Sequence, residues 1–165
     1  MNGMKFRIAR ALFPLAALTI MAGCQATPPA KAETMQPPAA ASNNINRLLT
    51  IITSPDPEIQ MMSLVLTRAA QTEGMSPRLM LCGPAGELAL KTPPEPAFTN
   101  FPPSGRSPDD LLSGLIASGA TVEVCALFLP TRNLTEEALR EGVGVATPAS
   151  IAEDFSAPET RLISF

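Results

Sequence analysis

Histidine, tryptophan and tyrosine are absent from the 165-residue sequence. Without His, the chain cannot use a Ser–His–Asp or Cys–His mechanism, and it cannot form a His-ligated metal site. Cysteine is scarce as well: the chain contains Cys24, Cys82 and Cys125, and no two of them form a CxxC pair of the kind that binds zinc. We therefore expect neither a metal site nor a cofactor.

Basic residues are few outside the first 23 positions. The sequence has 12 Lys and Arg against 15 Asp and Glu, and Lys5, Arg7 and Arg10 all precede residue 24. From residue 24 onward, 9 basic residues face 15 acidic residues, which gives a net charge of −6. Because a basic surface is needed to bind a phosphate backbone, we expect no nucleic-acid partner.

The N-terminus has the pattern of an export signal. Its three basic residues precede an apolar segment at 11–21 that is too short to span a bilayer. The segment ends in Met21-Ala22-Gly23-Cys24, which resembles the lipobox of bacterial lipoproteins. The resemblance implies a signal peptide over residues 1–23, cleavage before Cys24 and lipid attachment to its thiol. The alternative is an ordinary signal peptide that happens to contain a Cys.

The residues after Cys24 predict a tether. Residues 25–46 include four Pro and six Ala, a composition typical of an extended, solvated segment. By analogy with other lipoproteins, Gln25 in place of Asp implies anchoring in the outer membrane of the bacterial cell envelope, facing the periplasm. Two or more acyl chains anchor a protein stably in a bilayer. The expected partner is therefore a membrane, which the protein contacts through the lipid on Cys24.

Residues 47–165 predict one α/β domain. Apolar, β-branched runs alternate with segments of helical spacing, for example Ile59, Met62, Leu66 and Ala69. Such alternation indicates βαβ units, parallel pairing and a three-layer α/β/α architecture with five strands. The predicted strands cover 48–53, 78–82, 121–129, 143–146 and 161–165; predicted helices begin near 54–58, 107–110, 135 and 147.

The candidate reactive groups are the thiols of Cys82 and Cys125. Each occupies the fifth position of its predicted strand, at 78–82 and 121–125. Ligands of parallel sheets gather at the carboxyl ends of the strands, and the dipole of a following helix lowers a thiol pKa. The alternative is that each Cys is a small buried apolar residue. Arg132 is either a partner for a thiolate or simply exposed.

The strand that carries Cys125 also resembles a known family. Residues 119–126 (GATVEVCA) are similar to the G-V-x-V-x-V-C strand of the DsrE/DsrF-like family, and residues 81–90, 110–115, 134–145 and 161–165 resemble neighbouring segments. The resemblance extends over 48–165. It implies a parallel sheet in the order 4-3-2-1-5, homo-oligomers, and sulfur-relay chemistry in which a persulfide forms at the position of Cys125. Cys82 has no catalytic counterpart there, relay members are typically cytoplasmic, and many members have no established activity.

Export makes the pair of thiols relevant because the envelope is oxidising. In the implied strand order, strands two and three are neighbours, so Cys82 and Cys125 would be level, with roughly 5 Å between the strand backbones. We therefore consider a reversible disulfide between them, or a role for Cys82 as the thiol that resolves a sulfur-loaded Cys125.

Two classes of function follow. The first is a sulfane-sulfur carrier, at most a sulfurtransferase-like relay, that holds a persulfide on Cys125 and exchanges sulfur with a donor or acceptor protein. The second is a non-enzymatic envelope module for binding or assembly on the same fold, because a fold alone does not assign a function. Exposure of the Cys125 thiol distinguishes them, since a relay needs a thiol that a donor can reach.

Overall fold

A five-stranded parallel sheet forms the centre of the computed structural model, which describes residues 44–165. The strand order is β4-β3-β2-β1-β5, and every pair is parallel. This confirms the predicted α/β class and the order 4-3-2-1-5. The strands are β1 (Arg47–Ile52), β2 (Ser76–Leu81), β3 (Thr121–Cys125), β4 (Val143–Ala146) and β5 (Thr160–Ser164).

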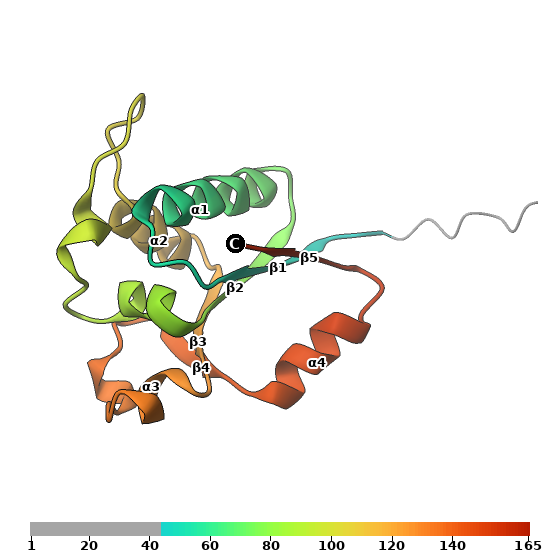
Figure 1. Cartoon of the computed structure of the whole chain (residues 1–165). Coiled ribbons are helices and arrows are strands. Elements are labelled where there is room, and N and C mark those ends of the chain that lie inside the picture. Colours follow the sequence, from blue (N-terminus) through green and yellow to red (C-terminus); the bar gives the residue numbers. More distant parts are fainter. Residues whose placement is uncertain (1–43) are drawn as a thin grey trace, which may run out of the picture. The chain divides into compact units, whose positions relative to one another are not determined.

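Helices lie on both faces of the sheet and complete the three layers. Helices α1 and α2 pack beside each other on one face, and α4 lies on the opposite face (Figure 1). The α-helices are α1 (Pro57–Thr72), α2 (Pro108–Ala117), α3 (Phe128–Thr131) and α4 (Pro148–Ser156). Three 3₁₀ helices occupy connecting segments: η1 (Gly83–Ala89), η2 (Glu95–Phe98) and η3 (Glu136–Ala138).

Short polar caps fix where the three long helices begin. The Asp56 carboxylate accepts hydrogen bonds from the backbone N–H groups of Glu58 and Ile59, at 2.8 and 3.2 Å. Ser107 and Asp110 form a capping box, in which backbone and side-chain hydrogen bonds from Ser107 lower the pKa of the Asp110 carboxyl. Thr147 caps α4, and a Pro follows each cap. The predicted starts of these helices are therefore confirmed.

The third strand is shorter than the sequence predicts. The expected strand 121–129 ends at Cys125, and residues Phe128–Thr131 form α3 instead. A strand continued through Pro130 would lose a ladder hydrogen bond, whereas the helical turn buries both Phe128 and Leu129. The helix expected at 135–140 is also wrong, because only the single 3₁₀ turn η3 forms there.

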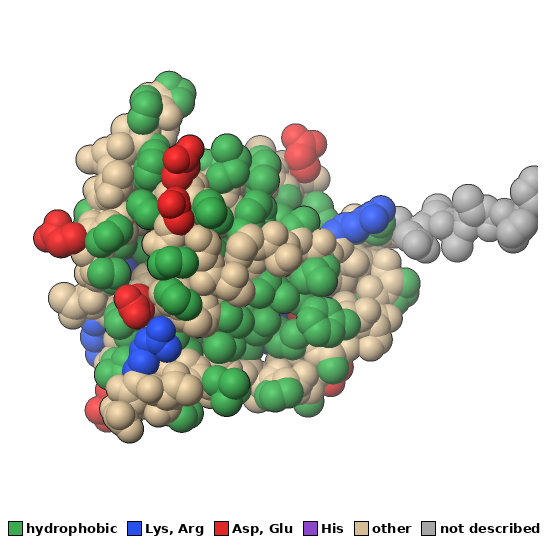
Figure 2. Space-filling model, in the orientation of Figure 1, with side chains coloured by type: hydrophobic (Ala, Val, Ile, Leu, Met, Phe, Trp, Pro, Cys, Tyr) green, Lys and Arg blue, Asp and Glu red, His purple; other side chains and the backbone are tan. Residues whose placement is uncertain are grey.

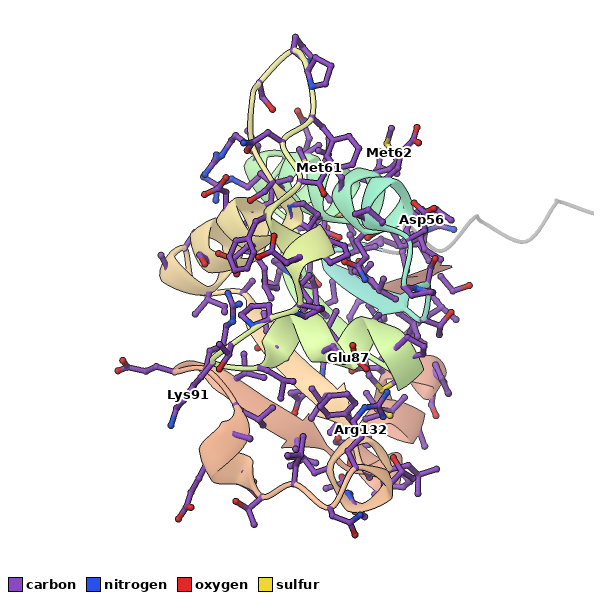
Figure 3. All side chains as sticks on the ribbon, turned by 60° about the vertical axis from the view of Figure 1, so that its left-hand side comes forward. Asp56, Met61, Met62, Glu87, Lys91 and Arg132 are labelled. Carbon is purple, nitrogen blue, oxygen red and sulfur yellow. The ribbon has the colours of Figure 1, made fainter. Side chains whose placement is uncertain are left out.

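The face of α1 that contacts the sheet carries polar as well as apolar side chains, because three polar residues are buried there beside Met61 and Leu64. Gln60, Ser63 and Thr67 are buried, and the Thr67 hydroxyl lies 2.9 Å from the hydroxyl of Thr50 on β1. The apolar positions whose spacing predicts the helix face solvent: Ile59, Met62, Val65 and Leu66 are 41–54% exposed. Figure 2 shows hydrophobic side chains on the surface over α1, and Met62 projects away from the sheet in Figure 3.

Alternate residues of the strands divide the apolar interior in two. The larger cluster contains Leu79, Leu81, Val122 and Val124, together with residues of α1, α2 and η1. The smaller cluster is formed by Leu49, Ala146 and Ile151 under α4. Because α4 is short, it leaves the second face thinly covered.

Within residues 44–165, none of the helices is long and apolar enough to cross a bilayer. The predicted signal peptide at 1–23, the lipid-attachment residue Cys24 and most of the predicted tether lie outside the described residues.

Candidate functional site

An apolar pocket lies between α4 and the carboxyl ends of β2, β3 and β4. Its volume is about 460 Å³. The pocket is therefore at the edge of the sheet where the two candidate thiols were expected. Its ten lining residues are Met80, Cys82, Cys125, Ala126, Leu127, Ala146, Thr147, Pro148, Ile151 and Phe155.

The structure places the two thiols side by side in this pocket. Leu81 of β2 pairs with Val124 of β3, so the residues that follow, Cys82 and Cys125, lie level with each other. Both thiols are free and half-buried. The neighbouring positions expected from the strand order are thus observed.

The setting of Cys82 changes the acidity of its thiol. Burial, the hydrogen bond with Cys125 and the charge on that thiol together raise the pKa of Cys82 to about 12. The expectation that a helix dipole lowers the pKa of Cys82 is therefore wrong: Cys82 precedes η1, but burial outweighs any effect of that 3₁₀ helix. At neutral pH Cys82 remains a thiol and can donate a hydrogen bond to the sulfur of Cys125.

Access to Cys125 is through an apolar rim. Leu127 and Phe155, which also line the pocket, are 71% and 60% exposed. Cys125 itself is half-buried and contacts both the main core and the pocket. This degree of exposure fits a thiol that small reagents can reach better than it fits a fully buried apolar residue.

Arg132 neither lines the pocket nor points freely into solvent. Its guanidinium donates to the Gly83 carbonyl at 3.1 Å, pairs with the Glu87 carboxylate at 3.4 Å and lies 4.3 Å from the ring centroid of Phe128. Figure 3 shows Glu87 and Arg132 next to each other on η1 and the segment after α3. These contacts join the segments that follow β2 and β3, and thus hold together the two loops that follow Cys82 and Cys125.

A cluster of ion pairs fastens α4 to the sheet beside the pocket. The Arg78 guanidinium of β2 donates to Glu123 of β3 at 2.7 Å and to Asp154 of α4 at 2.6 Å, and Arg47 of β1 also pairs with Asp154. The Asp154 side chain is only 2% exposed. Because Ile151 and Phe155 adjoin Asp154 on α4, this cluster positions two of the pocket walls.

Sequence reasoning did not identify this cluster. The available signal was the presence of Arg78 and Glu123 at alternating positions in strands that otherwise predict burial. Charged residues buried at such positions need partners. The partner Asp154 lies 76 residues beyond Arg78, so local spacing could not reveal it.

The described part of the chain contains no group of three or more Cys, Asp or Glu side chains arranged to hold a metal ion. The pocket itself presents two adjacent thiols in an apolar setting.

Comparisons with known proteins identify the fold. No known family and no curated protein sequence matches the chain. Among solved structures, the YchN protein from E. coli is similar, with a TM-score of 0.57 and 21% identity over 73% of this chain and 99% of YchN. A protein of unknown function, MTH1491 from Methanobacterium thermoautotrophicum, has a TM-score of 0.53 and 15% identity over 72% of this chain and 98% of its own. With the observed strand order, these similarities show a DsrE-like fold.

Proposed function

We propose that the protein is a sulfane-sulfur carrier, a sulfurtransferase-like relay that holds a persulfide on Cys125. The observation that carries this proposal is the pair of adjacent thiols at the floor of an apolar pocket, at the carboxyl ends of β2 and β3. The resemblance of the Cys125 strand to relay proteins supports the same assignment.

The two thiols take different roles in the proposed reaction. The Cys125 thiolate attacks the outer sulfur of a donor persulfide, R–S–SH; the S–S bond of the donor breaks, and R–S⁻ leaves and takes up a proton. The product is Cys125–S–SH. Cys82, which stays protonated, donates a hydrogen bond that stabilises negative charge on the reacting sulfur.

Discharge has two balanced routes. An acceptor thiolate can take the outer sulfur, which regenerates the Cys125 thiol. Alternatively, the Cys82 sulfur attacks the inner sulfur of Cys125–S–SH, which releases H₂S and forms a Cys82–Cys125 disulfide. This second route oxidises both cysteines while the sulfane sulfur is reduced, and an external dithiol must then restore the thiols.

The setting of the domain is part of the proposal. The lipobox-like sequence ending at Cys24 supports a lipid anchor in the bacterial envelope, with the domain on the periplasmic side of the outer membrane. The donor or acceptor is then another protein or small thiol of that compartment.

Intact-mass analysis tests the carrier function. We would use the full-length chain with Cys24→Ser, so that Cys82 and Cys125 are the remaining thiols, and incubate it with excess inorganic polysulfide. We expect a gain of one sulfur atom that dithiothreitol removes, that Cys125→Ser abolishes and that Cys82→Ser retains. A chain that gains no sulfur although Cys125 reacts with iodoacetamide would contradict the proposal.

The exposed apolar face of α1 favours the second function, an assembly module that forms homo-oligomers. Ile59, Met62, Val65 and Leu66 form a continuous stripe on one side of the helix. Analytical ultracentrifugation of the full-length chain tests this. We expect an oligomer that Met62→Glu together with Leu66→Glu dissociates, whereas Thr72→Glu, at an exposed polar position of the same helix, leaves it intact. A monomeric wild type would exclude homo-oligomerisation.

A further inference from the structure

The pocket in front of Cys125 carries no charged side chain. Apart from the two thiols, Thr147 contributes the only polar side chain among its ten lining residues. The rim is apolar as well, because Leu127 and Phe155 are the most exposed of the large hydrophobic residues of the described chain. A donor molecule must therefore give up water along an apolar surface before it reaches the sulfur of Cys125.

The charges near the pocket do not attract anions. Arg78 is held between Glu123 and Asp154, and Arg47 pairs with Asp154 and Glu159. Arg132, on the other side, is engaged by Glu87 and the Gly83 carbonyl. Residues 44–165 contain 8 basic and 14 acidic side chains, so the overall field also repels anions.

We propose that this pocket selects a sulfur donor with an apolar, uncharged substituent over donors that carry an additional negative charge, such as thiosulfate or a carboxylate-bearing persulfide. This inference rests on the carrier function proposed above and names its substrate class. The apolar substituent R of the donor R–S–SH lies between Leu127 and Phe155, while its outer sulfur contacts Cys125. Cys125 then forms the new S–S bond, the donor S–S bond breaks, and R–SH is released.

The setting of Cys82 agrees with this selectivity. Burial is the main cause of its raised pKa, and the same burial disfavours any other negative charge at the pocket floor. A donor with an anionic substituent brings an additional charge to this floor, whereas a donor with an uncharged substituent does not. The charge of the substituent therefore changes the rate at which sulfur is transferred to Cys125. It does not change which bonds form and break.

The test compares two persulfides of similar chain length, one of which ends in a methyl group and the other in a carboxylate. The full-length Cys24→Ser chain is incubated with n-butyl persulfide or with 3-carboxypropyl persulfide, each released from a masked precursor, and loading of Cys125 is followed by intact mass. We expect the butyl compound to load at least about tenfold faster, because the carboxylate must be desolvated at the apolar rim. Equal rates, or faster loading by the carboxylate, would overturn the proposal.

Two variants place the selectivity at this pocket. Leu127→Lys adds a cation at an exposed rim position and is expected to reduce the preference to a few-fold by accelerating the carboxylate. Phe98→Lys adds the same charge at an exposed position of η2 outside the pocket, and the ratio should not change. An equal change of the ratio in both variants would mean that overall charge, and not the pocket, sets the preference.

A second readout separates this proposal from the carrier function. Neutral propyl methanethiosulfonate and anionic sulfonatoethyl methanethiosulfonate both convert a thiol to a mixed disulfide, with release of methanesulfinate. Their relative rates at Cys125 in a Cys82→Ser background report the pocket's selectivity without persulfide chemistry. If neither persulfide loads Cys125 but the neutral reagent reacts faster than the anionic one, the carrier function fails and the selectivity of the pocket stands. If both persulfides load Cys125 at equal rates, the carrier function stands and the selectivity fails.

Discussion

The face of the sheet that α1 and α2 cover is closed, whereas α4 alone covers the described part of the other face. On the closed face, Leu64, Leu79, Leu112 and Val124 are fully buried. On the α4 face, the buried apolar cluster is small, ion pairs hold the helix, and two thiols line a pocket. The stability of this domain therefore comes mainly from one face, which leaves the other free to carry reactive groups.

Of the substitutions that test the difference between the two faces, removal of the Asp154 carboxylate should have the largest effect on stability. In Asp154→Ala, the guanidinium of Arg78 loses its link to α4, and we expect a loss of about 3–5 kcal/mol in the free energy of unfolding. Urea denaturation measures this, and the rate of Cys125 alkylation in the native state should rise as α4 loosens. Glu153→Ala, on the exposed side of the same helix, is the control and should change neither quantity.

Truncating one large side chain on each face compares the two directly. Leu112→Ala creates a cavity in the closed core and should cost about 2–5 kcal/mol. Ile151→Ala, beside an existing pocket, should cost about 1–2 kcal/mol because its side chain is packed on one side only. Similar losses from both substitutions in urea denaturation would mean that the two faces contribute equally.

Gly86→Ala tests how tightly the core is linked to the segment after Cys125. A Cβ at Gly86 would lie 2.3 Å from the Phe128 ring, so the ring must move or the loop must shift, at a cost of about 1–3 kcal/mol. Gly114→Ala in α2, where the nearest atoms lie at 3.7 Å, should instead gain up to about 1 kcal/mol. The melting temperatures of the two variants should therefore move in opposite directions.

The open face should also give stability a dependence on alkaline pH, an effect confined to pH values above the ordinary thiol pKa. The pKa of Cys82 in the folded chain is raised to about 12, above the ordinary value of about 8.5 for an unfolded thiol. The unfolded chain therefore loses this proton first, so the stabilisation is complete below pH 8.5 and declines as the pH rises toward 12. Cys82→Ala should flatten this decline in urea denaturation measured from pH 8 to 11; an unchanged slope would contradict it.

Local signals predicted where the three long helices begin. The caps at Asp56, Ser107 and Thr147 act within three residues, so the sequence reveals them directly. The position of Cys82 beside Cys125 followed from the strand order that the family resemblance implied. Of the residues in the candidate site, the two thiols were the easiest to predict from the sequence, because the chain has few other reactive groups.

Contacts between residues far apart in the sequence could not be predicted from local signals. The spacing of Ile59, Met62 and Leu66 indicates a helix but does not say which side contacts the sheet. Buried hydroxyls such as Thr67 are satisfied by Thr50 and the Ser63 carbonyl, so a face that carries polar residues can be the inner one. The ion pairs under α4 join residues 45 to 107 positions apart, beyond the reach of any periodicity.

The shared carboxylate of Asp154 has a mechanical consequence. Arg47 is the first residue of β1, which lies between β2 and β5 and connects to the N-terminal part of the chain. A force that pulls on the N-terminal part of the chain acts along β1. It shears the hydrogen bonds from β1 to β2 and from β1 to β5 at the same time, so both sets of bonds resist it together. The same pull reaches α4 through the Arg47–Asp154 pair. Tension along the chain before residue 44 is therefore transmitted to the helix that covers the two thiols.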